Sequence, residues 1–127
     1  MKEVWVVDDD EEMARAVSLM LQLLDYTAKH FTNPRPAAQA LLAGKLPDLL
    51  ILDINMPEVS GLDMLEFLRR RPEWKDLPVI MLSSEAADVM VEKALKLGAD
   101  AYTMKPVTIE ELEKAMSQAF YKHVLKK

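Results

Sequence analysis

The sequence predicts an α/β fold in which five parallel strands form one sheet with helices on both faces. The apolar pattern changes repeatedly between short continuous runs, typical of strands buried on both sides, and helical spacing. Five such strand–helix units follow one another within 127 residues, the size of a single domain. Alternating units of this kind build a parallel sheet through right-handed crossovers.

The first two units occupy the N-terminal third of the chain. Residues 4–7 form a continuous apolar, β-prone run, and the apolar residues within 13–24 then recur at helical spacing. Residues 26–31 form a second, weaker strand. Pro36 is suited to the first turn of the next helix, and Gly44 is expected to end that helix.

The third and fourth units follow the same plan. Residues 49–52 and 79–82 are short apolar runs that predict strands. Each is followed by an apolar stripe at helical spacing, within 62–68 and 91–95 respectively. Gly98 is expected to end the fourth helix.

The fifth unit contains a short strand at 101–104 and the last helix. Thr108 with Glu111 three residues later forms the capping-box pattern that begins a helix. An apolar stripe then runs through residues 109–120. The cations at its end suit the helix dipole: Lys122, His123, Lys126 and Lys127.

Five strands fit the flavodoxin-like, doubly wound (βα)5 sheet with strand order 2-1-3-4-5. This order puts the weak second strand at an edge. In such sheets ligands bind beyond the carboxyl ends of the strands, near the switch point between strands 1 and 3. The residues that follow each strand are therefore the candidates for chemistry.

Composition excludes several classes of protein. The net charge of −5 argues against general nucleic-acid binding, and no apolar run approaches the roughly 18 residues of a membrane span. The absence of cysteine excludes a disulfide framework and a zinc–thiolate site, and the first residues are too short an apolar stretch for a signal peptide. We expect a cytoplasmic, single-domain chain (1–127) without an output domain.

Acidic side chains follow the first and third strands. Asp10 and the acids after it suit a helix N-terminus, a capping role as plausible as a functional one. Asp8 and Asp9, in contrast, repel each other and Asp53, so they need a cation. Their oxygens suit Mg²⁺, which keeps waters and shares a phosphate oxygen. Asp53 is either an acid in an ordinary turn or a nucleophile that forms an aspartyl phosphate.

Polar side chains also follow the fourth and fifth strands. Ser83 is suited equally to a helix cap and to a hydrogen bond with a phosphoryl oxygen. Lys105 lies between Met104 and Pro106, an unusual place for a solvated charge, and is predicted to pair with Asp53 and to neutralise a phosphoryl group. The two histidines, His30 and His123, are isolated, which favours structural or surface roles.

Together, these motifs resemble those of the receiver domains of two-component response regulators, including chemotaxis regulators. The resemblance extends from about Glu3 to Phe120. Each motif alone is weak evidence for this family, but all of them in this order form a highly specific set. The motifs are Val6-Val7-Asp8-Asp9-Asp10, Leu52-Asp53-Ile54-Asn55-Met56-Pro57, Gly61, Leu82-Ser83-Ser84 and Ala101-Tyr102-Thr103-Met104-Lys105-Pro106.

The resemblance implies roles for the acidic residues and their neighbours. Asp53 would accept a phosphoryl group from a histidine kinase or a histidine phosphotransfer protein. Asp9 would bind Mg²⁺ directly, and Asp8 would assist, partly through water. Asn55 would offer its backbone carbonyl to the metal.

The resemblance also implies a switch. Ser83 would move to bond the phosphoryl group, which Lys105 also contacts, and Tyr102 would rotate inward. The face of the fourth helix, fifth strand and fifth helix would then meet an effector or output domain. The protein would be a monomer or a phosphorylation-dependent dimer, and at most self-catalysed phosphorylation and dephosphorylation at Asp53 would occur. Without the resemblance, Tyr102 is equally an ordinary half-buried strand aromatic.

Three other classes are alternatives. A Mg²⁺-dependent phosphatase with an aspartate nucleophile usually has a second acid two residues later, where Asn55 stands. A flavin-binding protein would need Ser, Thr or Gly after the first strand, where the acids would repel a phosphate. A phosphorylation-independent interaction module on the same fold is opposed by the complete set of acids, hydroxyl and lysine. A stand-alone receiver and one from a longer regulator both fit the motifs.

Overall fold

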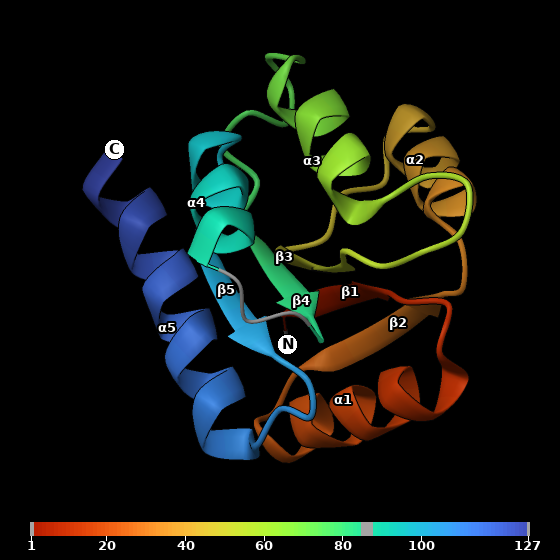
Figure 1. Cartoon of the computed structure of the whole chain (residues 1–127), viewed down its shortest axis with the longest axis vertical. Helices are drawn as coiled ribbons and strands as arrows, with labels where there is room; N and C mark the ends of the chain where they lie inside the picture. Colours follow the sequence, from red (N-terminus) through yellow and green to blue (C-terminus); the bar gives the residue numbers. More distant parts are fainter. Residues whose placement is uncertain (1, 85–87, 127) are drawn as a thin grey trace.

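The computed structural model describes residues 2–84 and 88–126. It has one five-stranded parallel sheet in the order β2-β1-β3-β4-β5, which confirms the predicted topology (Figure 1). The strands are β1 (Glu3–Val7), β2 (Thr27–Phe31), β3 (Leu49–Asp53), β4 (Val79–Ser83) and β5 (Ala101–Met104). The helices are α1 (Glu11–Leu23), α2 (Pro34–Leu42), α3 (Gly61–Arg69), α4 (Asp88–Lys96) and α5 (Ile109–Lys126).

The helices form two layers that sandwich the sheet. Helices α1 and α5 cover one face, and α2, α3 and α4 cover the other (Figure 1). Alternate strand residues point to opposite faces, so Val4 and Val6 pack with α1 and α5 while Trp5 and Val7 pack with the other layer. This two-sided burial explains why the inner strands read as continuous apolar runs.

Two strands end one residue later than the sequence predicted. Asp53 pairs with Leu82 across β3 and β4, and Ser83 pairs with Met104 across β4 and β5. The predicted ends at 52 and 82 were set by the change from apolar to polar side chains, whereas the backbone ladder continues through that change. Asp53 and Ser83 are therefore held by the sheet itself and not by a loop.

Helix caps fix the loops that leave the sheet. Asp10 is the N-cap of α1, as one of its two predicted roles required. Thr108 and Glu111 form the predicted capping box before α5. A second capping box, between Ser60 and Asp63, begins α3 and was not predicted. Among the described residues no helix is long and apolar enough to cross a membrane, and the predicted cationic side chains of His123, Lys126 and Lys127 lie outside the description.

Candidate functional site

The register of the sheet brings three carboxylates together. Val7 pairs with Leu52 across β1 and β3, so the next residues, Asp8 and Asp53, lie side by side at the spacing of neighbouring strands. Carboxylate oxygens of Asp8, Asp9 and Asp53 lie within 4.8 Å of one another. Asp8 and Asp53 are 0% and 1% exposed, whereas Asp9 is exposed. The predicted convergence of these acids is confirmed.

Lys105 lies between the two buried carboxylates. Its Nζ is 3.0 Å from Asp8 Oδ2 and 3.1 Å from Asp53 Oδ1. Its backbone N–H donates to the carbonyl of Ser83 at 2.8 Å, which continues the β4–β5 ladder up to the lysine. The predicted pairing with Asp53 is confirmed, and the structure adds a pairing with Asp8. The ammonium of Lys105 thus supplies part of the positive charge that the neighbouring acids were predicted to need.

Two oxygens of this cluster, Asp8 Oδ2 and Asp53 Oδ2, are buried without a hydrogen bond among the described residues, and Lys105 forms an ion pair with the first of them. Asp8 Oδ1 accepts from the Asp10 N–H at 2.9 Å, and Asp53 Oδ1 accepts from the Asn55 N–H at 3.3 Å. Asp53 Oδ2 is buried and has no hydrogen-bond partner among the described residues. A buried polar atom left in this state costs free energy. Oxygen donors with an unsatisfied position fit a hard cation such as Mg²⁺, which also binds waters and phosphate.

The pKa values of Asp53 and Lys105 are both raised, but for different reasons. The pKa of Asp53 is raised to about 7, because burial and then the charge of Asp8 raise it more than the ammonium of Lys105 lowers it. Burial alone would lower the pKa of Lys105, but its bonds to the two carboxylates outweigh this effect and raise that pKa. A bound cation would favour the ionised form of Asp53.

Of the remaining predicted residues, Ser83 and Asn55 lie at the same end of the sheet as the acids, whereas Tyr102 lies further back in β5, opposite Met81. Ser83 is the buried last residue of β4, and Tyr102 is half-buried in β5 and packs against the core under α2, α3 and α4. The side-chain amide of Asn55 donates to Ser84 Oγ at 3.2 Å, which links the loops that follow β3 and β4. The structure therefore brings Ser83 and Asn55 to the acids and leaves Tyr102 within the strand, while the roles of all three stay predictions.

Two residues contact the acids in ways that the sequence did not predict: His30, which the sequence presents as isolated, and Gly61, which was named as a motif without a role. The Nε2 of His30 lies 2.8 Å from the backbone carbonyl of Asp8. Gly61 begins α3 against the backbone of Asp53, where an added Cβ would meet the carbonyl oxygen at 2.2 Å. In the register of β1 and β2, His30 lies beside Val6. This register cannot be predicted from the spacing of residues along the chain.

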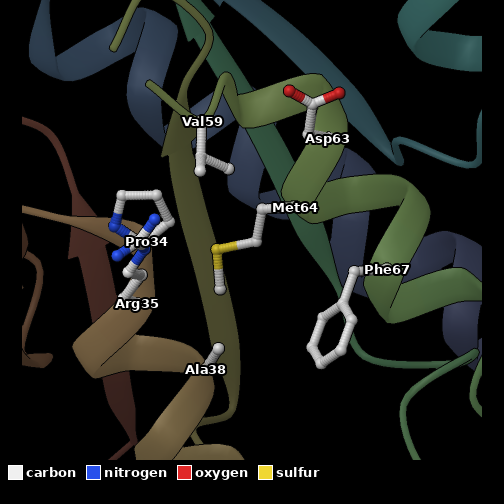
Figure 2. Close-up of a pocket in the computed structure, with 7 residues that line it drawn as sticks. All are labelled: Pro34, Arg35, Ala38, Val59, Asp63, Met64 and Phe67. Atoms are coloured by element: carbon white, nitrogen blue, oxygen red, sulfur yellow. The ribbon is translucent and has the colours of Figure 1, made fainter. Parts of the chain in front are cut away.

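A separate hollow lies between α2 and α3 (Figure 2). It has a volume of about 220 Å³ and an almost wholly apolar surface. Met64 of α3 and Ala38 of α2 line it, and its charged members, Arg35 and Asp63, are exposed. None of its described lining residues belongs to the acidic cluster, which is therefore the candidate for chemistry.

Comparison with known proteins shows the family to which the chain is similar. The family model described as the response regulator receiver domain matches residues 4–117. The two-component response regulator ARR10 of Arabidopsis thaliana is 37% identical over 98% of this chain and 22% of that protein. The chemotaxis protein CheY of Pseudomonas aeruginosa is 30% identical over 93% of this chain and 95% of that protein. The solved structure of CheY4 from Vibrio cholerae has a TM-score of 0.84 at 28% identity, covering 94% of this chain and 98% of that one.

The length of these relatives varies widely. For three of the curated relatives, ARR10 included, the chain spans only 17% to 49% of the relative's length. The region shared with these three relatives is therefore only part of each of them.

Proposed function

The chain belongs to the response regulator receiver domain family of two-component signalling, and on this premise we propose that phosphorylation of Asp53 switches it. Receiver domains are signalling domains that interact with histidine kinases and output domains. The observation that carries the proposal is the buried Asp8–Lys105–Asp53 arrangement, in which Asp53 Oδ2 has no hydrogen-bond partner among the described residues.

The proposed transfer is a nucleophilic substitution at phosphorus. An oxygen of ionised Asp53 attacks, the P–N bond to a phosphohistidine donor breaks, and the electron pair leaves with the imidazole, which is then protonated. The new P–O bond makes an acyl phosphate. The Lys105 ammonium, already 3.1 Å from Asp53, is placed to accompany the phosphoryl oxygens.

Asp8, Asp9, Asp53 and the backbone carbonyl of Asn55 would hold Mg²⁺. The geometric support is the group of carboxylate oxygens within 4.8 Å and the unsatisfied Asp53 Oδ2. When bound, Mg²⁺ supplies positive charge that offsets the charge of phosphoryl oxygens. Its binding also favours the ionised form of Asp53, whose pKa is raised by burial.

Phosphorylation would bias a two-state element. The acyl phosphate adds strong acceptors and roughly −2 of charge to an acidic, buried site. The buried hydroxyl of Ser83 would donate to a phosphoryl oxygen, and Tyr102 would move inward with it. The surface of α4, β5 and α5 would then bind an effector or an output domain. The donor would be a histidine kinase or a histidine phosphotransfer protein.

The test is intact mass spectrometry after incubation with a small acyl phosphate, with and without Mg²⁺. We expect one added phosphoryl group that requires Mg²⁺ and is absent in Asp53→Ala. The matched control is Glu113→Ala, because Glu113 is an exposed acid of α5 outside the cluster, and this variant should be labelled as well as wild type.

Two outcomes would contradict the proposal. Labelling of Asp53→Ala at the wild-type level would show that another residue is the acceptor. No labelling by either the small donor or a histidine kinase would favour an interaction module that acts without phosphorylation.

A further inference from the structure

We propose that His30 is a positioning residue that holds the peptide between Asp8 and Asp9 in the conformation that binds a divalent cation. The inference rests on the proposed function, since it concerns the same acidic site. It starts from one contact, in which His30 Nε2 lies 2.8 Å from the backbone carbonyl oxygen of Asp8. Because a carbonyl only accepts, Nε2 must carry the hydrogen.

The contact continues the sheet where its backbone ladder ends. The Asp8 N–H donates to the Phe31 carbonyl at 3.0 Å. Phe31 is the last residue of β2, and Asn33 already caps α2, so the chain turns away from β1 at this point. His30, one residue before the strand ends, reaches back to Asp8 with its side chain.

This hydrogen bond acts on the ligand geometry through a planar group. The Asp8 carbonyl and the Asp9 N–H belong to one peptide plane, so fixing the carbonyl fixes the direction in which the chain enters Asp9. Asp8 is then held at its N–H, its carbonyl and both carboxylate oxygens. Asp9 is exposed, so packing in the core does not fix its side chain. The orientation of Asp9 depends on the backbone before it.

The role does not depend on the charge of the ring. Neutral imidazole with its hydrogen on Nε2 and charged imidazolium both donate from Nε2. His30 is half-buried on the edge strand, on the same face as Ala28, which packs against the core under α1. Groups that hold metal ligands without touching the metal typically change metal affinity 10–100-fold when they are removed.

The test measures Mg²⁺ affinity by isothermal titration calorimetry at one pH, beside urea unfolding in Mg²⁺-free buffer. We expect His30→Leu to raise the dissociation constant for Mg²⁺ about tenfold, the lower end of that range because the contact is to backbone. His30→Gln, whose amide nitrogen extends about as far as Nε2, should regain most of the affinity. Phe31→Leu, on the same strand with its carbonyl retained, should lower the urea midpoint and leave the Mg²⁺ affinity unchanged.

Wild-type affinity in His30→Leu, or an equal loss in Phe31→Leu, would overturn the inference. If His30→Leu does not fold, the decisive measurement is the ¹⁵N spectrum of the wild-type His30 ring. A hydrogen on Nε2 supports the contact, and a neutral ring with its hydrogen on Nδ1 overturns it. If wild type is phosphorylated and His30→Leu binds Mg²⁺ as tightly as wild type, this inference is wrong and the proposed function stands. Mg²⁺ binding that depends on His30, without any phosphorylation of Asp53, would instead remove the proposed function.

Discussion

Asp53 has a raised pKa although a lysine ammonium lies 3.1 Å away. An ion-paired carboxyl group ordinarily shows a lowered pKa, because the cation favours the ionised form. Here burial acts in the opposite direction and is the larger effect, and the adjacent Asp8 adds to it. One ammonium cannot balance two buried carboxylates, so the protein's own side chains leave this site short of positive charge.

This imbalance gives a pH-dependent stability in Mg²⁺-free buffer. The pKa of Asp53 is about 7 in the fold against an ordinary 3.8, so the folded protein binds the proton more tightly than the unfolded chain. Its stabilising contribution is complete below pH 4 and is lost as pH rises through 7. We expect Asp53→Asn to exceed wild type in unfolding free energy at pH 8 by about 2 kcal/mol, a value reduced from the full shift because the variant also loses the ion pair with Lys105.

Urea unfolding at pH 5 and pH 8 measures this effect. The difference between Asp53→Asn and wild type should grow with pH, and added Mg²⁺ should reduce it at pH 8 by stabilising wild type through binding. A difference that shrinks with rising pH would mean that Asp53 has a lowered pKa and is fully satisfied by Lys105.

At the scale of elements, α3 is packed directly against the end of β3. The absence of a side chain at Gly61 allows this approach, since a Cβ would lie 2.2 Å from the Asp53 carbonyl oxygen and 3.0 Å from the Cα of Ile54. These neighbours are backbone atoms in a buried strand end, so they cannot move as a flexible side chain would. The position of α3 and the position of the Asp53 backbone are therefore coupled.

We expect Gly61→Ala to lower the free energy of unfolding by about 2 kcal/mol, within the range for overpacking, and to slow phosphorylation of Asp53. The control is Gly44→Ala. Gly44 has a φ of +93° and no atom near the added Cβ, so this variant should lose about 1 kcal/mol from backbone strain alone. Its phosphorylation rate should equal that of wild type. Equal phosphorylation rates in Gly61→Ala and Gly44→Ala would show that the position of α3 does not affect phosphorylation of Asp53.

At the scale of the whole molecule, the buried ion pair between Arg69 and Asp100 connects several segments. It lies at the end of the sheet where the strands begin, away from the acids. Arg69 of α3 bonds Asp100 Oδ2 at 3.0 Å and the carbonyls of Trp74 and Gly98 at 2.9 and 3.0 Å. Asp100 Oδ2 also accepts from the Val79 N–H at 2.8 Å. The pair therefore joins α3, the start of β4 and the two loops that lead into β4 and β5.

We expect Arg69→Met to lower the free energy of unfolding by about 3 kcal/mol, because it leaves the buried Asp100 charge without its cation. The neighbouring Arg70→Met is the control. Arg70 pairs with Glu66 on the surface and its side chain is 75% exposed, so the loss should stay below about 1 kcal/mol. Thermal or urea unfolding of both variants decides this, and similar losses would mean that the buried pair contributes no more than a surface pair.

The sequence alone determined the architecture. Apolar runs alternating with helical stripes predicted every strand and helix, and capping patterns such as Thr108 with Glu111 predicted where α5 begins. These signals are local, since they depend on side chains a few residues apart. The family resemblance, carried by short motifs at the strand ends, was confirmed by the match over residues 4–117. The cytoplasmic location and the absence of an output domain stay predictions.

Only the tertiary structure decided which atoms meet. It showed that Lys105 bonds both Asp8 and Asp53, that His30 holds the Asp8 carbonyl and that Gly61 closes α3 on β3. Each contact joins residues from different strands or helices, and it depends on strand register and helix placement. Those quantities are set by packing of the whole core, so the spacing of residues along the chain does not contain them.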